Sequence, residues 1–343
     1  MADRLWRGEA STRSHHPVVS TGDLCEVADS VAFVPTFANC TAVDTGDGLL
    51  LVDTASSFTA DRLFEQVRGW RRGRLDTAVF SHGHIDHVFG VGPFEAEAAQ
   101  AGWPAPRVVA HERVAHRFDR YRLTAGYNEV VNRRQFGIDS IVWPTQYRYP
   151  DEEYSETLSL RVGGIDVELR HEMGETDDAT VTWLPGLKVL CPGDLFVWSS
   201  PNAGNPQKVQ RYPREWATAL RRMASLGATL LLPGHGLPIA GADRISQALT
   251  ETAEYLESLV DQVLELMNAG ARLAEVIETV TPPAHLVDRP FLQPVYDEPE
   301  FIVRNVWRLY GGWWDGNPAH LHPPGARTLA GELSDLVGGA ARL

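Results

Sequence analysis

The 343-residue sequence has few cysteines and no long apolar segment. Cys25, Cys40 and Cys191 are odd in number and widely separated, which argues against a disulfide framework and favours a reducing compartment. Because no run of about 18 apolar residues is present, we expect no membrane span. The first residues also lack the apolar core of a signal peptide. These absences together predict a cytoplasmic protein.

The sequence is also poor in positive charge. Its 45 acidic side chains against 31 basic ones give a formal net charge of −14. Such a surface would repel a nucleic-acid backbone, so we expect no nucleic-acid partner. Apolar residues make up 43% of the chain and charged residues 22%, which is typical of a globular protein. The length allows one large domain and a smaller one.

Metal-binding side chains are concentrated in one heptapeptide, Ser81–His87, with the sequence Ser-His-Gly-His-Ile-Asp-His. The four candidate ligands in it are His82, His84, Asp86 and His87. Imidazole and carboxylate together suit zinc or iron better than magnesium or calcium. The preceding residues 75–80 predict a short buried strand, and the loop after such a strand is where α/β folds usually present their chemistry. A single histidine is usually structural, but this density of ligands predicts a metal site.

The spacing within the heptapeptide predicts two ion positions. His82 and His84 lie two residues apart and can face one ion, whereas Asp86 and His87 face a second position. Two ions roughly 3.5–4 Å apart can hold a hydroxide between them and polarise a substrate oxygen. Because one cluster cannot complete two sites, the rest of the chain must supply a bridging carboxylate and further ligands.

The heptapeptide resembles the signature of the metallo-β-lactamase superfamily, and three further segments follow in that family's order. Residues 39–55 resemble its opening β-hairpin, with Asp53 near the end. Residues 190–194 resemble the strand that delivers the bridging aspartate, and residues 230–236 the strand and loop that deliver the last histidine. The resemblance spans about residues 30–240 and implies an αββα sandwich. It also implies Asp194 as the bridge and His235 as a ligand of the second ion.

One position points to a branch of this superfamily. Many members have a histidine after glycine in a Gly-His-Thr segment, where this chain has Glu175 between Gly174 and Thr176. A carboxylate here is a feature of the zinc alkylsulfatase branch, so the resemblance implies Glu175 as the ligand beside His82 and His84. Residues 261–270 and 303–318, the latter with Trp-Asp-Gly-Asn-Pro, resemble the helical dimerisation region of those sulfatases. The resemblance therefore also implies a homodimer, and we expect no sterol-carrier-like domain of the kind that long alkylsulfatases append.

The pattern of apolar residues predicts three parts: an extended arm at 1–25, a catalytic domain at 26–242 and a helical region at 243–343. Strands are expected within 31–52, at 108–112, within 158–169 and at 229–232, and helices at 59–72, up to 122, at 214–226, from 272 and at 299–310. An apolar seam from Leu249 to Met267 predicts one long helix closed by Gly270, whose seam serves packing or a dimer surface. Residues 124–150 are expected to be irregular.

An anionic substrate needs fixed cations and amide donors, which the acidic surface otherwise lacks. The irregular segment 124–150 is a candidate substrate wall beside the metal site. The candidate substrate contacts are Arg133, Arg134, Asn202, Asn205 and Lys208. His111 and Cys191 are also near the expected site, but a structural histidine and a small buried thiol are the favoured interpretations.

These observations predict a dinuclear metal-dependent hydrolase with two zinc ions, although iron or manganese also suits the ligands. Metal-bound water or hydroxide would be the nucleophile, and a small anionic ester, with alkyl sulfate esters favoured, would be the substrate. Asp86 and Asp194 are the candidate catalytic residues, and Asp86 either binds metal or orients the attacking water. The alternatives are a lactone, thioester or β-lactam hydrolase of the same fold, a mononuclear iron thiol or persulfide oxygenase, and a non-enzymatic scaffold.

Overall fold

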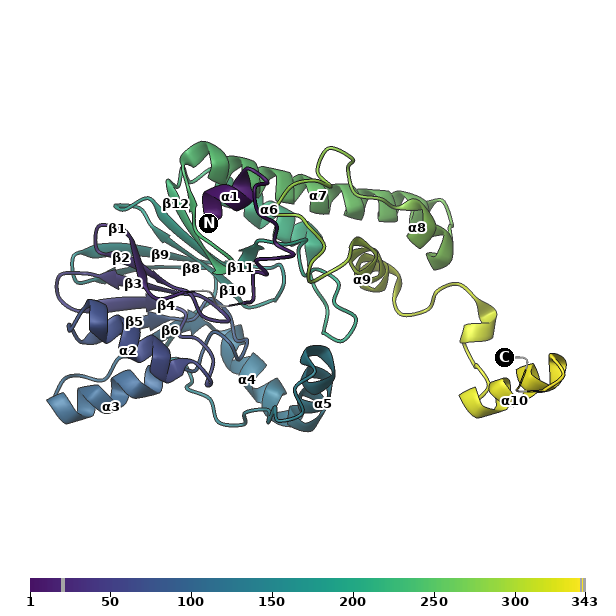
Figure 1. Cartoon of the computed structure of the whole chain (residues 1–343), viewed down its shortest axis with the longest axis horizontal. Coiled ribbons are helices and arrows are strands. Elements are labelled where there is room, and N and C mark those ends of the chain that lie inside the picture. Colours follow the sequence, from purple (N-terminus) through teal and green to yellow (C-terminus); the bar gives the residue numbers. More distant parts are fainter. Residues whose placement is uncertain (20–21, 340, 342–343) are drawn as a thin grey trace.

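The computed structural model describes residues 1–19, 22–339 and 341, and it forms a four-layer αββα sandwich (Figure 1). Two β-sheets face each other across a core of apolar side chains that includes Phe33, Val43, Val167 and Leu232. A second core lies between the first sheet and the helices that cover it. A third core lies between the second sheet and the helices on the opposite side of the molecule. This arrangement confirms the predicted fold class.

The first sheet has seven strands that follow one another in sequence order. They are β1 (Cys25–Ala28), β2 (Val31–Val34), β3 (Cys40–Asp44), β4 (Leu49–Val52), β5 (Leu75–Val79), β6 (Arg107–His111) and β7 (Glu152–Tyr154). Strands β1 to β4 pair antiparallel, and β4 to β7 pair parallel. In β4 alternate residues enter different cores: Leu49 and Leu51 face the helices, whereas Leu50 and Val52 face the second sheet. This alternation explains why β4 reads as a continuous apolar run.

The second sheet has six strands in the order β13-β12-β11-β10-β9-β8. They are β8 (Thr157–Val162), β9 (Ile165–Glu172), β10 (Ala179–Leu184), β11 (Val189–Val197), β12 (Leu230–His235) and β13 (Ile239–Ala240). Strands β11 and β12 pair parallel, and the crossover between them contains helix α6 (Pro213–Ala224). The carboxyl ends of β11 and β12 therefore meet at one edge of the sandwich, close to the end of β5.

The outer layers are formed by amphipathic helices. Helices α2 (Ala60–Trp70), α3 (Val91–Ala101) and α4 (Arg113–Leu123) cover the first sheet, and α6 and α7 (Ala242–Asn268) cover the second (Figure 1). The predicted seam of α7 is buried inside this chain, so its role is packing rather than dimer contact. No helix among the described residues has both the length and the apolar character needed to cross a membrane.

The C-terminal region contains α8 (Leu273–Thr279), α9 (Pro299–Gly311), the 3-10 helix η1 (Pro318–His320) and α10 (Ala326–Leu336). Ile302, Val303 and Val306 of α9 pack into the core that α6 and α7 share. One hydrophobic core therefore extends across the predicted boundary at 242/243. Beyond α9 the chain leads away from the sandwich, and α10 lies apart from it (Figure 1).

Two predictions about local structure were wrong. Residues 1–25 are not simply an extended arm, because α1 (Ala2–Trp6) inserts Leu5, which is only 1% exposed, into the core beside α7. Part of the segment predicted to be irregular forms α5 (Ala125–Phe136), which ends at Gly137 in the left-handed conformation. This helix is mostly polar and lacks an apolar stripe, so its sequence gave no helical periodicity.

Candidate metal centre

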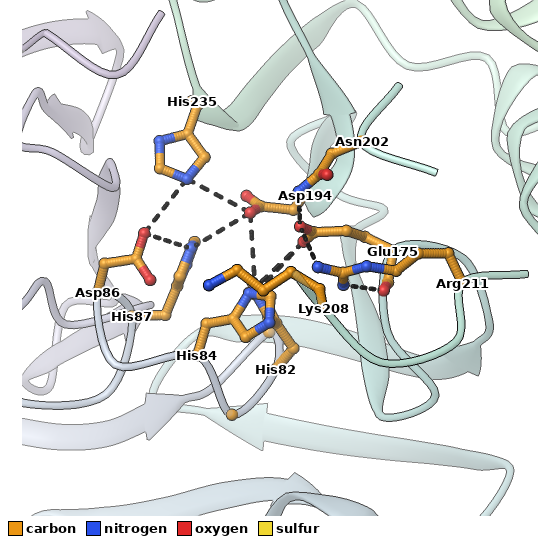
Figure 2. Close-up of polar contacts among 12 residues, drawn as sticks. His82, His84, Asp86, His87, Glu175, Asp194, Asn202, Lys208, Arg211 and His235 are labelled. Carbon is orange, nitrogen blue, oxygen red and sulfur yellow. Dashed lines mark hydrogen bonds and ion pairs between the residues drawn. The ribbon is translucent and has the colours of Figure 1, made fainter. Parts of the chain in front are cut away.

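The seven predicted ligands come from both sheets and meet at one edge of the sandwich (Figure 2). His82, His84, Asp86 and His87 lie in the loop after β5, Glu175 lies between β9 and β10, Asp194 lies in β11, and His235 ends β12. The close approach of β11 and β12 requires glycine, since a Cβ on Gly234 would lie 2.1 Å from Asp194 Oδ1. The Pro-Gly-His sequence of β12 thus brings His235 beside the aspartate.

The first group of side chains consists of His82, His84, Glu175 and Asp194, with one potential ligand atom each, all within 4.8 Å of one another. Glu175 Oε2 lies 3.5 Å from His84 Nδ1 and 3.9 Å from His82 Nε2. Asp194 Oδ2 lies 3.8 Å from His82 Nε2. His82, Glu175 and Asp194 are buried, so these polar atoms face one another rather than solvent.

The second group consists of Asp86, His87 and His235, also within 4.8 Å of one another. Asp86 Oδ2 lies 3.4 Å from His235 Nε2 and 3.6 Å from His87 Nε2. Asp194 Oδ2, the oxygen near His82, also lies 3.6 Å from His87 Nε2 and 3.3 Å from His235 Nε2. One carboxylate oxygen therefore faces both groups, which is the position a bridging ligand needs.

Residues behind these groups orient the imidazole rings. Asp53 Oδ2 lies 2.7 Å from His87 Nδ1, and the carbonyl oxygen of Phe37 lies 2.6 Å from His235 Nδ1. A proton held at Nδ1 by such an acceptor leaves Nε2 free to face the site. Asp53 has a φ of 59°, a strained backbone conformation for aspartate that is fixed by its bonds to Ser81 and His87. The sequence marked Asp53 only as the end of a hairpin.

Unpaired polar atoms test whether these residues fit metal ions. His87 Nε2, Glu175 Oε2 and Asp194 Oδ1 are buried without a hydrogen-bond partner among the described residues. Leaving such atoms unpaired is costly, and native proteins rarely do so without a ligand, water or ion. The nitrogen–oxygen separations between 3.3 and 3.9 Å are too long for good hydrogen bonds but leave room for a shared cation. Four imidazoles and three carboxylates could thus hold two divalent ions of the zinc, iron or manganese type.

Burial and neighbouring charge shift the pKa values in this cluster. Burial lowers the pKa of His82 to about 4. Burial also opposes protonation of His235, but the carboxylates of Asp194 and Asp86 outweigh it and raise the pKa of His235 to about 10. Burial raises the pKa of Glu175 to about 7, although Arg211 acts in the opposite direction. The acidic cluster therefore attracts positive charge, and metal binding at His235 would have to displace a proton.

A cavity of about 310 Å³ opens beside the two ligand groups. Its lining includes the polar side chains of Asp86, Glu175, Asp194 and Lys208, but most of the lining is apolar. The apolar wall includes Phe37, Phe136, Ile141, Val142, Trp143 and Pro144. Lys208 Nζ donates a hydrogen bond to Asn132 Oδ1 at 3.2 Å, and no ion pair between Lys208 and a carboxylate is found among the described residues. Burial lowers the pKa of Lys208 to about 8.

The predicted substrate contacts separate into two sets. Lys208 and Asn202 line the cavity, but Asn202 Nδ2 donates to Glu175 Oε1. Arg133, Arg134 and Asn205 are outside the cavity lining. Arg133 instead bonds the carbonyl oxygen of Ile141 and pairs with Glu129 on its own helix, and the side chain of Asn205 accepts from the amide of Gln207.

Sequence reasoning missed Arg211, which is 1% exposed and whose guanidinium contacts both the carboxylate and the main-chain carbonyl oxygen of Glu175. The sequence around Arg211 did not indicate a role for it, because its partner Glu175 lies in a different loop, between β9 and β10. The two residues judged structural behave as expected. His111 stacks on His171 with ring centroids 3.7 Å apart, and Cys191 lies beside Thr41, where burial raises the thiol pKa to about 12.

Two protein families match parts of this chain. The family described as the metallo-beta-lactamase superfamily matches residues 34–235, and the family described as alkyl sulfatase dimerisation matches residues 272–343. A linear primary-alkylsulfatase from a Pseudomonas strain is 25% identical over 87% of this chain and 60% of its own length. An alkyl/aryl-sulfatase from Saccharomyces cerevisiae is 24% identical over 98% of this chain and 55% of its own length.

A solved structure shares the fold over nearly the whole chain. The stereoselective inverting sec-alkylsulfatase Pisa1 from Pseudomonas sp. is 23% identical, with a TM-score of 0.84 over 98% of this chain and 57% of its own. The chain thus spans little more than half the length of these relatives. Since the superfamily match covers more than half of the sequence and the sandwich is the one expected for it, this chain belongs to the metallo-β-lactamase superfamily.

Proposed function

We propose that this protein is a dinuclear metal-dependent hydrolase of anionic esters, with alkyl sulfate esters as its substrate class. The observation that carries the proposal is the convergence of two ligand groups on a single oxygen of Asp194. The presence of Glu175 in the first group and the likeness to alkylsulfatases favour sulfate esters over the other substrates of this fold.

In this proposal the two ions share Asp194. One ion would be held by His82, His84 and Glu175, and the other by Asp86, His87 and His235. Two such ions lower the pKa of water and polarise an ester oxygen. Asp53 and the Phe37 carbonyl hold two of the imidazoles with Nε2 toward the site. Asp86 lines the cavity, so its carboxylate can also orient an attacking water and accept its proton.

The cavity suits an amphiphilic anion. Lys208 lines the cavity and has no ion-pair partner among the described residues, so its ammonium group would bind the sulfate group. Phe136, Ile141 and Trp143 form an apolar wall for the hydrocarbon part. Burial of hydrocarbon contributes about 0.8 kcal/mol per CH₂ group. We therefore expect KM to fall as the alkyl chain lengthens, until the chain fills the cavity.

Sulfate release from primary and secondary alkyl sulfates by the zinc-loaded protein tests this function. The chain has two lysines, which provide a matched pair of variants: Lys208→Met in the cavity and Lys188→Met on an exposed turn. Loss of a charge-assisted contact worth about 1.5–3 kcal/mol lowers kcat/KM roughly 10- to 150-fold in Lys208→Met. Lys188→Met should behave as the wild type. Absence of sulfate release from every alkyl sulfate tested would refute the proposal.

Metal analysis of the same preparation separates the proposal from the iron oxygenase. We expect two metal ions per chain, because the two ligand groups are distinct and share only Asp194. One iron per chain, with oxygen uptake in the presence of a thiol or persulfide, would favour the mononuclear oxygenase instead.

We also propose that the protein forms a homodimer through residues 272–343, the part that matches the dimerisation family. No residue of α10, all of which the structure describes, is buried. One face of this helix carries Leu329, Leu333 and Leu336, which are 45%, 44% and 83% exposed. An apolar helix face held away from the sandwich (Figure 1) is suited to cover the same region of a second copy.

A further inference from the structure

The two carboxylate oxygens of Glu175 have different partners (Figure 2). Oε2 faces His84 Nδ1 at 3.5 Å and has no hydrogen-bond donor among the described residues. Oε1 accepts a hydrogen bond from Asn202 Nδ2 and lies 3.3 Å from an Arg211 guanidinium nitrogen. The carboxylate is therefore held at one oxygen while the other is directed at the histidine pair.

The guanidinium of Arg211 makes two polar contacts with Glu175. This guanidinium is buried and also donates to the main-chain oxygen of Glu175, so one side chain holds both the backbone and the carboxylate of that residue. Within the described residues, Glu175 is the ion-pair partner found for Arg211. A buried guanidinium without a paired anion would be strongly destabilising, which makes each residue of this pair depend on the other.

The combined charge of the two ligand groups explains why such a pair is needed. With Glu175 present the cluster contains three carboxylates, Asp86, Glu175 and Asp194, whereas a histidine at 175 would leave two. Buried carboxylates held close together repel one another unless a positive charge lies beside them. The positive charge of Arg211 offsets this additional negative charge.

Arg211 is itself held in place by the C-terminal region. Asn305 of α9 is 4% exposed, and its Nδ2 donates to the carbonyl oxygen of Arg211 at 3.0 Å. Asn305 Oδ1 in turn accepts from Gln210 Nε2 at 2.9 Å. A continuous series of contacts thus leads from α9 through Arg211 to the candidate ligand Glu175.

We propose that Arg211, assisted by Asn202, is a positioning residue that makes Glu175 a metal ligand by offsetting its charge and directing Oε2 toward His82 and His84. The inference rests on the metal centre proposed above. It implies that Glu175 and Arg211 act as a unit, and that a neutral imidazole at position 175 does not need the guanidinium.

Zinc binding in the absence of substrate tests this unit. The variants are Arg211→Gln, Arg211→Lys, Glu175→His and the double variant Glu175→His/Arg211→Gln, measured by competition with a chromophoric chelator and by the absorption spectrum of bound cobalt(II). We expect Arg211→Gln to weaken one of the two sites about 10- to 100-fold. Arg211→Lys should recover part of the loss, and the double variant should bind more tightly than Arg211→Gln alone. Arg214→Gln, which removes an exposed arginine paired with Asp261, is the matched control.

If folded Arg211→Gln bound zinc at both sites with wild-type affinity, the inference would be overturned. It would also be overturned if the loss of zinc-binding free energy in the double variant equalled the sum of the losses in the two single variants. If Arg211→Gln does not fold, the Asn202→Ala variant tests the inference instead. This variant removes one hydrogen-bond donor to Glu175 without leaving a buried charge unpaired. Weaker binding and a changed cobalt spectrum in Asn202→Ala support the inference, and an unchanged affinity and spectrum contradict it. A wild-type protein that binds no metal would refute the proposed function itself, which keeps the two failures distinguishable.

Discussion

Asp53 Oδ2 lies 2.7 Å from His87 Nδ1, and the same carboxylate accepts hydrogen bonds from the backbone and the side chain of Ser81. An amide in its place would present a donor to at least one of these donors. We therefore predict that Asp53→Asn weakens zinc binding about 10- to 100-fold, because His87 loses its fixed orientation. Competition with a chromophoric chelator measures the change, and Asp76→Asn on neighbouring β5 is the control. Equal affinity in Asp53→Asn would contradict the assigned role.

Removal of metal should destabilise the fold. An ion that binds only the folded chain stabilises it by about 2.7 kcal/mol at a free concentration 100 times its dissociation constant. We expect the midpoint of thermal unfolding to fall when a chelator is added and to return on addition of zinc. Identical midpoints in zinc and in chelator would show that the ligand groups bind no ion in the folded chain.

The stacked pair His111 and His171 should make stability dependent on pH. Burial, followed by the charge of His171, lowers the pKa of His111 from 6.5 to about 4. Below pH 6.5 the unfolded chain takes up a proton that the folded chain does not, so the stabilisation is complete above pH 6.5 and is lost as the pH falls toward 4.

The resulting loss amounts to at most about 3 kcal/mol between these pH values. Urea unfolding in chelator at pH 4.5 and pH 7.5 measures it, and His111→Gln should have a smaller pH dependence than the wild type. Exposed His116→Gln serves as the control. The same pH dependence in His111→Gln and the wild type would rule out this histidine as the source.

Asn305 lies in α9, outside the sandwich, but we expect it to contribute to the free energy of unfolding of the sandwich. Asn305→Ala removes the hydrogen bonds that this side chain makes with Arg211, Gln210 and Arg308, and it takes a donor away from the buried carbonyl oxygen of Arg211. We expect it to lower the free energy of unfolding by about 1–3 kcal/mol. Denaturant titration measures the loss beside Arg304→Ala, an exposed neighbour paired with Glu300. Equal losses in the two variants would argue against a special role for Asn305.

A charge on the exposed face of α10 should separate the proposed dimer. Leu333→Asp places a carboxylate among Leu329 and Leu336, and desolvation of this charge would oppose burial against a second copy. Analytical ultracentrifugation should find dimers for the wild type and for Ser334→Asp, but monomers for Leu333→Asp. Dimers that persist in Leu333→Asp would place the contact elsewhere in residues 272–343.

The sequence was sufficient to predict the sandwich and the set of side chains that meets at its edge, because ligand spacing, strand patterns and family order all pointed to the same answer. It was not sufficient for contacts that depend on how distant loops pack. Asn202 was expected to bind sulfate but bonds Glu175, and Arg211 carried no signal at all. The pattern of apolar residues also did not predict α5, because that helix is mostly polar. It did not predict the burial of Leu5 either, because Leu5 is a single apolar residue buried from a largely polar segment.

The candidate ligands are divided between the two sheets: the loop after β5 belongs to one, whereas β11, β12 and the loop after β9 belong to the other. Neither sheet with its loops supplies all the ligands of either group. Metal ions bound here would link the two sheets. They could bind fully only after both sheets have folded and packed together. The supply of metal would then affect how much of the chain reaches its folded state, because an ion that binds only the folded chain adds to its stability.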